Sequence, residues 1–196
     1  MEPFPHFNRY RFMAVDPGSN KAGVSIFDID FKQRKIISIQ TWTVETEKLK
    51  NDTPLLPEIH PQKMIKLYRL RNEFSRILKE FKPDFVAYEG PFINTRNPNA
   101  FGPLIQVLTM IFDAVVTENP GVHFHIMQPQ SVKKSLGVAG KKGKEVILEA
   151  IMKVEELTDG LKNGETEIES LDDNALDSVA VGWCALKTHI FKEILL

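Results

Sequence analysis

The groups best suited to do chemistry in this sequence are four acidic side chains from three distant segments. They are Asp16, Glu89, Asp173 and Asp177. Carboxylate oxygens are the ligands that hard divalent cations such as Mg²⁺ and Mn²⁺ prefer. Two such ions, about 3.5 to 4 Å apart, can clamp the attacking and leaving oxygens of a phosphodiester. If the fold brings these acids together, we expect a hydrolytic site with two metal ions.

Each acid also has an ordinary structural explanation. An acid at a strand end, such as Asp16, is often a turn former. Asp172 or Asp173 could cap the last predicted helix, because a side-chain oxygen at that end satisfies free backbone N–H groups. Capping does not account for Asp177, which lies one turn deeper among small apolar residues. Asp173 and Asp177 would repel each other at this spacing, and a bound cation would relieve that repulsion. Glu89 ends a strongly apolar run, where an unpaired buried carboxylate would be costly.

The elements that must position these acids follow from hydrophobic periodicity and turn signals. The pattern predicts strands at 10–16, 22–29, 35–43, 84–89 and 122–127, and helices at 64–82, 104–118, 144–157 and 172–190. The turn-rich DPGSNK joins the first two strands as a hairpin, so the chain opens with an antiparallel three-stranded meander. Irregular insertions are predicted at 45–62, which holds three prolines, and at 159–171. We therefore expect an α/β protein with a central mixed sheet, followed after the meander by alternating helices and strands.

Length and composition exclude several classes of protein. The 196 residues, 42% of them hydrophobic, fit one domain spanning 1–196. The 25 basic and 26 acidic residues give no overall attraction to nucleic acid, so any such affinity needs a local patch. Cys184 is the only cysteine, which excludes an internal disulfide framework. The longest apolar stretch, near 107–116, is broken by Asp113 and is too short for a membrane helix. No targeting segment is recognisable, so we expect a cytoplasmic protein, of a bacterium or of a host cell if the source is viral.

A local basic patch is present in the segment 133–144. It contains Lys133, Lys134, Lys141, Lys142 and Lys144, interleaved with three glycines. Lysines neutralise phosphates and release counterions, and glycines let the backbone approach a bulky duplex. The patch is either a DNA-binding loop or an ordinary solvated surface.

Four segments, taken together and in order, resemble the RuvC-type Holliday junction resolvases of the RNase H-like superfamily. They are VDPGSNKAG, PDFVAYEGPF, QSVKKSLGVAGKKGKEVI and DDNALDSVAVGWCAL. The pattern is closest to viral and phage members. The resemblance implies an RNase H-like fold, a homodimer, and Mg²⁺-dependent cleavage of branched DNA at symmetric positions. The resemblance implies that Asp16, Glu89 and Asp177 are the catalytic acids.

The resemblance also bears on the remaining site residues. The bacterial pattern has its penultimate acid three residues before the last, where this sequence has Asn174. We predict Asp173 as the fourth carboxylate, with Asn174 as a neutral oxygen ligand in the alternative. Lys133 and Lys144 match functional lysines of the family. Phe92 matches an aromatic that stacks on bases at the junction centre, although a ring folded into the core is the ordinary alternative.

Three functions are compatible with these features. The leading hypothesis is a structure-selective DNA endonuclease that resolves four-way junctions, and other branched DNA, by two-metal-ion hydrolysis. The alternatives are a catalytically inactive junction-binding protein and an actin-like phosphotransferase, since the latter enzymes share the D-x-G opening. The chain is too short for the two lobes of a phosphotransferase. Paired nicks need two equivalent sites, and the helix predicted at 104–118 has more apolar positions than one core-facing stripe requires, so we expect it to form the dimer interface.

Overall fold

Five strands form one mixed sheet in the computed structural model, which describes residues 9–50, 53–91, 101–140 and 143–191. The strands are β1 (Arg9–Asp16), β2 (Lys21–Asp30), β3 (Lys35–Glu45), β4 (Phe85–Glu89) and β5 (His123–Met127). Their order across the sheet is β3-β2-β1-β4-β5. The first three strands pair antiparallel, and β4 runs parallel to both β1 and β5. The predicted meander and mixed sheet are confirmed.

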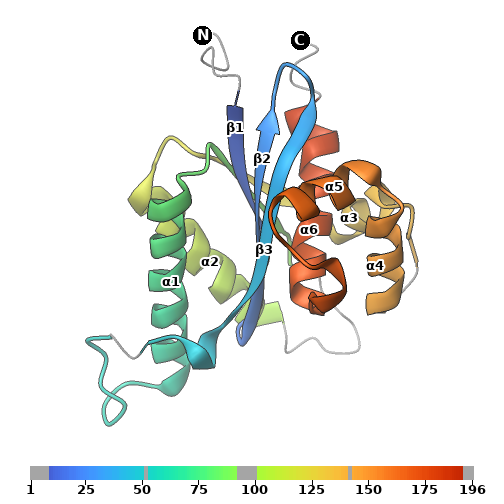
Figure 1. Cartoon of the computed structure of the whole chain (residues 1–196). Coiled ribbons are helices and arrows are strands. Elements are labelled where there is room, and N and C mark those ends of the chain that lie inside the picture. The colour runs from blue at the N-terminus through green and yellow to red at the C-terminus, as the bar shows by residue number, and fades with distance from the viewer. Residues whose placement is uncertain (1–8, 51–52, 92–100, 141–142, 192–196) are drawn as a thin grey trace.

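Side chains alternate across the central strands and fill two separate cores. Along β1, Phe12 and Ala14 point into the core on one face, while Met13 and Val15 point into the core on the other. The strand β4 is likewise buried on both faces, as its continuous apolar run predicts. Helices must therefore cover both sides of the sheet, and Figure 1 shows α1 and α2 on one side and α3 to α6 on the other.

The helices α1 (Gln62–Phe81) and α2 (Phe101–Glu118) lie together on one face of the sheet. Arg71 of α1 reaches across to Asp113 of α2 at 2.8 Å. Lys82 adopts a left-handed conformation with φ of 47° and caps α1 just before Pro83, where the sequence predicts the helix to stop. By length and composition alone α2 could cross a membrane, but one of its faces is buried in this core.

The opposite face of the sheet carries four helices and the C-terminal turn. These elements are α3 (Pro129–Ser135), α4 (Lys144–Met152), α5 (Glu155–Asn163), α6 (Asp173–Ala185) and the π-helical turn η4 (Leu186–Ile190). Two short 3₁₀ turns, η1 (Thr46–Lys48) and η3 (Ile168–Ser170), lie in the segments predicted to be irregular. In the core of this face, α6 packs on β1, β2 and β4.

Two of the predicted boundaries on this face are wrong. The single helix predicted at 144–157 is two helices that break at Lys153 and Val154, and α5 continues into the start of the 159–171 segment. Gly160 falls in the segment predicted to be irregular, but it lies inside α5. A Cβ there would come within 2.7 Å of the Ile36 side chain. The glycine is thus a packing residue that lets α5 lie close to β3. The short helix α3 is also missed by the sequence pattern, which shows only a basic segment there.

Candidate active site

Strand register places Asp16 and Glu89 side by side at one edge of the sheet. Val15 of β1 is paired with Tyr88 of β4 in a parallel ladder, so the next residue of each strand is an acid. Asp16 lies two residues beyond Ala14, and Glu89 two residues beyond Ala87. Because side chains alternate along a strand, both acids share the face on which these alanines pack against α6. The third acid, Asp177, lies on α6 itself.

A missing side chain in β2 allows α6 to approach these strands closely. Gly23 is the cross-strand partner of Asp16. A Cβ on Gly23 would lie 1.8 Å from the backbone oxygen of Asn174 in the first turn of α6. The helix therefore rests directly on the backbone of β2, opposite Asp16. This contact brings the acids of α6 to the edge where the strands end.

Buried hydroxyl groups fix α6 at this position. The Ser25 Oγ and Ser178 Oγ atoms are 2.6 Å apart, and both side chains are fully buried. The Ser25 hydroxyl also lies 2.8 Å from Thr41 Oγ1, so β2, β3 and α6 share one hydrogen-bonded cluster. Polar groups in a core favour one arrangement of their elements, because any shift would leave a buried hydroxyl without a partner.

Of the two candidates, Asp172 and Asp173, it is Asp172 that caps α6. Its Oδ1 accepts hydrogen bonds from the backbone N–H of Ala175, at 3.0 Å, and from the Thr43 hydroxyl. Burial disfavours the charged form of Asp172, but these hydrogen bonds and the nearby Lys21 together hold its pKa below the ordinary value. The cap leaves Asp173 exposed in the first turn of the helix, where its charge acts on Asp177.

The three acids at the sheet edge perturb one another strongly. Burial, together with the charges of Glu89, Asp177 and Asp172, raises the pKa of Asp16 to about 8. Burial and the charge of Asp177 raise the pKa of Glu89 to about 7. Burial also raises the pKa of Asp177 to about 6. Without a cation, the cluster therefore retains protons near neutral pH.

One lysine partly offsets this repulsion. The charge of Lys133, on α3, acts to lower the pKa of both Glu89 and Asp177. The helix α3 is held against α6 by a hydrogen bond from Trp183 Nε1 to the backbone oxygen of Ser135. Lys133 therefore lies beside the acids and is half-buried, whereas Lys134 is exposed.

The chemistry of the cluster fits a divalent cation. All of its donors are carboxylate oxygens, and the buried like charges are stabilised only if a proton or a cation lies among them. In the described part of the chain, no three Asp, Glu, His or Cys side chains stand close enough to coordinate one ion together. A bound ion would therefore have to draw the carboxylates together through side-chain rotation.

Of the remaining predicted residues, Lys144 and Asn174 lie within the described ranges. Lys144 begins α4, at the N-terminal end of that helix. Phe92, Lys141 and Lys142 lie outside the described residues. Asn174 is half-buried in the first turn of α6, with its backbone against Gly23.

Comparisons with known proteins identify the family of this chain. The family model of the crossover junction endodeoxyribonuclease RuvC matches residues 12–181. The chain belongs to the RuvC family. It is 28% identical to the crossover junction endodeoxyribonuclease RuvC of Thermotoga maritima over 174 residues, which cover 89% of each protein.

Solved structures confirm the RuvC architecture. Thermus thermophilus RuvC in complex with a Holliday junction substrate matches with a TM-score of 0.63 and 19% identity, over 94% of this chain and 96% of that one. The yeast mitochondrial Holliday junction resolvase Ydc2 matches with a TM-score of 0.59 and 17% identity, over 98% of this chain and 87% of that one. The predicted RNase H-like α/β fold is thus confirmed for this RuvC family member.

Sequence reasoning misses the residues that hold the clustered acids in place. Gly23 lies within VDPGSNKAG, but its packing role depends on a helix some 150 residues later in the chain. Ser25, Ser178 and Thr43 are small polar residues with no distinctive spacing. The only local signal is a hydroxyl at inward-facing positions of a strand or helix that is otherwise apolar.

Proposed function

We propose that this protein is a structure-selective endonuclease that cuts four-way DNA junctions, and other branched DNA, at the edge of the sheet where its acids meet. The observation that carries the proposal is the convergence of Asp16, Glu89 and Asp177 from three elements, each with a raised pKa. A cluster that keeps protons in the absence of a cation is suited to bind one when its carboxylates are drawn together. RuvC membership supports a Holliday junction nuclease over the other candidate functions.

Asp16, Glu89 and Asp177, with Asp173 as the fourth carboxylate, would hold two Mg²⁺ or Mn²⁺ ions. Such ions lower the pKa of an attacking water and stabilise the leaving oxygen of a phosphodiester. The carboxylates of this chain act as ligands and orient the phosphate relative to the sheet edge. Lys133, beside the cluster, supplies a positive charge for the phosphate oxygens.

DNA binding is assigned to the lysine-rich segment beside the acids. The proposed phosphate contacts are Lys133 and Lys134 on α3, Lys144 at the start of α4, and Lys141 and Lys142, which lie outside the described residues. Phosphate contacts set the register of the DNA without reading its sequence, which suits an enzyme that recognises branch structure. Phe92 is proposed to stack on unpaired bases at the junction centre.

A homodimer is proposed through α2, because two symmetric nicks require two equivalent sites. Ile105, Phe112 and Val116 recur along one face of α2 and are 39%, 49% and 45% exposed. The opposite face of α2 is already buried against α1 and the sheet. An exposed apolar stripe on a helix with one buried face is typical of a subunit contact.

The test is cleavage of labelled four-way junctions, flaps and forks with Mg²⁺, with Ca²⁺ and without metal. We expect paired cuts in Mg²⁺, binding without cutting in Ca²⁺, and no cutting by Asp16→Asn, Glu89→Gln or Asp177→Asn variants that still bind junctions. Binding without cutting by the wild-type protein in Mg²⁺ and in Mn²⁺ would favour the inactive junction-binding alternative. Hydrolysis of nucleotides without cutting of DNA would favour the phosphotransferase.

A further inference from the structure

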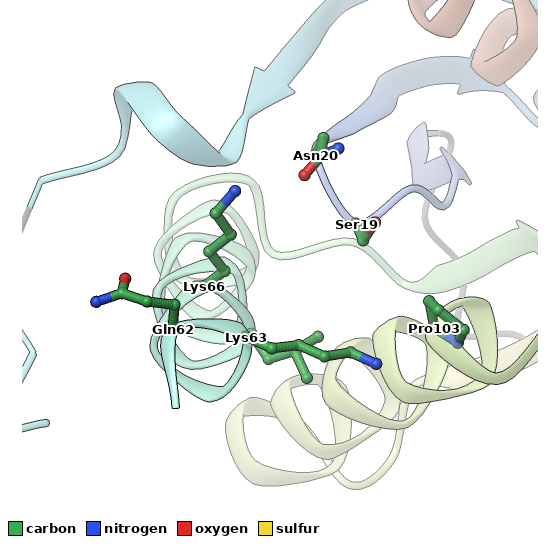
Figure 2. Close-up of a pocket in the computed structure, with 7 residues that line it drawn as sticks. Ser19, Asn20, Gln62, Lys63, Lys66 and Pro103 are labelled. Carbon is green, nitrogen blue, oxygen red and sulfur yellow. The ribbon is translucent and has the colours of Figure 1, made fainter. Parts of the chain in front are cut away.

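A cavity of about 430 Å³ lies beside the turn that follows Asp16, on the side of the sheet covered by α1 and α2. The turn between β1 and β2, the start of α1 and the start of α2 enclose it (Figure 2). Its polar and charged walls are Ser19, Asn20, Gln62, Lys63 and Lys66. None of the described residues that line it is acidic, so the cavity is suited to an anion.

The turn that forms one wall is held rigidly. Thr46 is fully buried, and its backbone N–H donates to the Asn20 carbonyl oxygen at 2.9 Å. Its hydroxyl donates to the Ser19 carbonyl oxygen at 3.1 Å. A Cβ on Gly18 would lie 2.0 Å from the Lys21 oxygen, so the turn cannot relax around a side chain there. The first residues of the 45–62 segment thus fix the wall of the cavity.

Two ammonium groups extend from α1 toward this turn and the start of α2 (Figure 2). Lys63 is exposed and makes no ion pair or hydrogen bond within the described ranges. Lys66 is paired with Glu47 at 2.9 Å, but Glu47 is 74% exposed. Ion pairs between exposed side chains are weak, so an entering anion can draw Lys66 away from Glu47. Pro61 gives α1 no side-chain cap, which leaves N–H groups of its first turn free for the same anion.

The distance to the acid cluster indicates which anion this is. Ser19 follows Asp16 by three residues, so their Cα atoms are at most about 11 Å apart. Successive phosphates of one DNA strand rise by about 3.4 Å along the duplex. A strand with its scissile phosphate at Asp16 can therefore place a phosphate two to four nucleotides away in the cavity.

We propose that this cavity binds a backbone phosphate of the DNA strand being cut, a few nucleotides from the cleavage site. This inference rests on the proposed function and adds to it a second phosphate contact, across the sheet edge from the lysines of α3. A phosphate held by Lys63 and Lys66 fixes the position of the strand along the sheet edge, and so the bond that reaches the acids.

The first test compares two charge-matched double variants. Lys63→Gln/Lys66→Gln removes the cavity cations, whereas Lys79→Gln/Lys162→Gln removes two exposed lysines at the far end of α1 and on α5. Junction affinity is measured in Ca²⁺ over a range of salt concentrations. We expect the cavity variant to bind about three- to tenfold more weakly than the control and to lose about one unit of salt slope.

The second test identifies the phosphate. A single neutral methylphosphonate is placed in turn at each of the positions within five nucleotides of the cut. For the wild-type protein, one position two to four nucleotides from the cut should weaken binding. That position should have no effect in the cavity variant, while all other positions keep their effects. Asn20→Asp, which adds a negative charge to the rigid turn, should remove the same effect and replaces the double variant if that variant melts below the control.

The outcomes separate the two proposals. If the wild-type protein neither binds nor cuts four-way junctions, the proposed function fails and the cavity proposal fails with it. If the wild-type protein binds and cuts, but the cavity variant matches the control in affinity, salt slope and methylphosphonate profile, only the cavity proposal is overturned.

Discussion

Removal of the most perturbed carboxylate should make the metal-free protein more stable while it destroys cleavage. Asp16 has an ordinary pKa of 3.8 and a pKa of about 8 in the folded protein. Between these values the folded state holds a proton that the unfolded state has lost. The free energy of unfolding therefore falls as pH rises from about 4 to about 8. Asp16→Asn removes this penalty, because the amide has nearly the same shape and no charge.

The magnitude follows from the pKa shift. Four pH units at about 1.4 kcal/mol each give an upper bound of about 6 kcal/mol. Asp16 is half-buried, and water can reach the site as the acids separate, so we expect roughly half of this value, about 2 to 3 kcal/mol. For a protein of this size, that corresponds to a rise in Tm of about 4 to 12 °C.

The assay is thermal unfolding in EDTA at pH 5, 6.5 and 8. The quantity compared is the Tm difference between Asp16→Asn and the wild type, since titrating groups away from the acid cluster contribute equally to both. This difference should be small at pH 5 and largest at pH 8. Asp159→Asn, which removes an exposed acid on α5, serves as the control for the loss of one carboxylate. Added Mg²⁺ at pH 8 should raise the Tm of the wild type more than that of Asp16→Asn.

Two results would refute this reasoning. An Asp16→Asn protein no more stable than the wild type at pH 8 would mean that the carboxylate is not buried among like charges. A Tm difference that stays constant from pH 5 to pH 8 would mean that the stabilisation does not come from ionisation. Either result would also remove the main electrostatic support for a cation at this edge.

Three further perturbations test the packing and assembly around the site. Gly23→Ala should lower cleavage at least tenfold at fixed Mg²⁺ but retain junction binding in Ca²⁺, because the new Cβ displaces the first turn of α6 at Asn174. Cleavage at the wild-type rate would contradict this account. The Thr43 hydroxyl holds Asp172, so Thr43→Val should lower the free energy of unfolding by about 1 to 2 kcal/mol in denaturant and raise the Mg²⁺ concentration needed for cutting. Thr43→Ser keeps the hydroxyl and should restore the wild-type stability and Mg²⁺ requirement. Phe112→Asp should give a monomer by sedimentation with its Tm nearly unchanged, because this ring is half exposed on α2. A wild-type protein that is itself monomeric would exclude the proposed interface.

Local patterns were sufficient to predict the strands that carry the acids. Alternation in β1 and β2, and the continuous apolar run of β4, place Asp16 and Glu89 at strand ends, and the structure confirms these elements. Prediction was weaker where tertiary packing overrides a local signal. Gly160 falls in a segment predicted to be irregular but lies in a helix, where close packing on Ile36 requires a residue without a side chain.

The same distinction explains what could be predicted about the site. The acids can be identified from their residue type and their place at the ends of elements. Their electrostatic coupling cannot, since it depends on how closely α6 lies against β2. That distance is set by the absence of a side chain at Gly23 and by the buried contact between Ser25 and Ser178, which are 153 residues apart.

The acids at the sheet edge have opposite effects on the stability of the metal-free fold and on cation binding. Buried carboxylates destabilise the metal-free fold, yet they are the groups that would bind cations. The fold tolerates them because buried hydroxyl groups and the apolar cores on both faces of the sheet fix the elements that carry them. A cation bound at the cluster would therefore act on carboxylates carried by elements that are already fixed, and its binding would not have to order the fold.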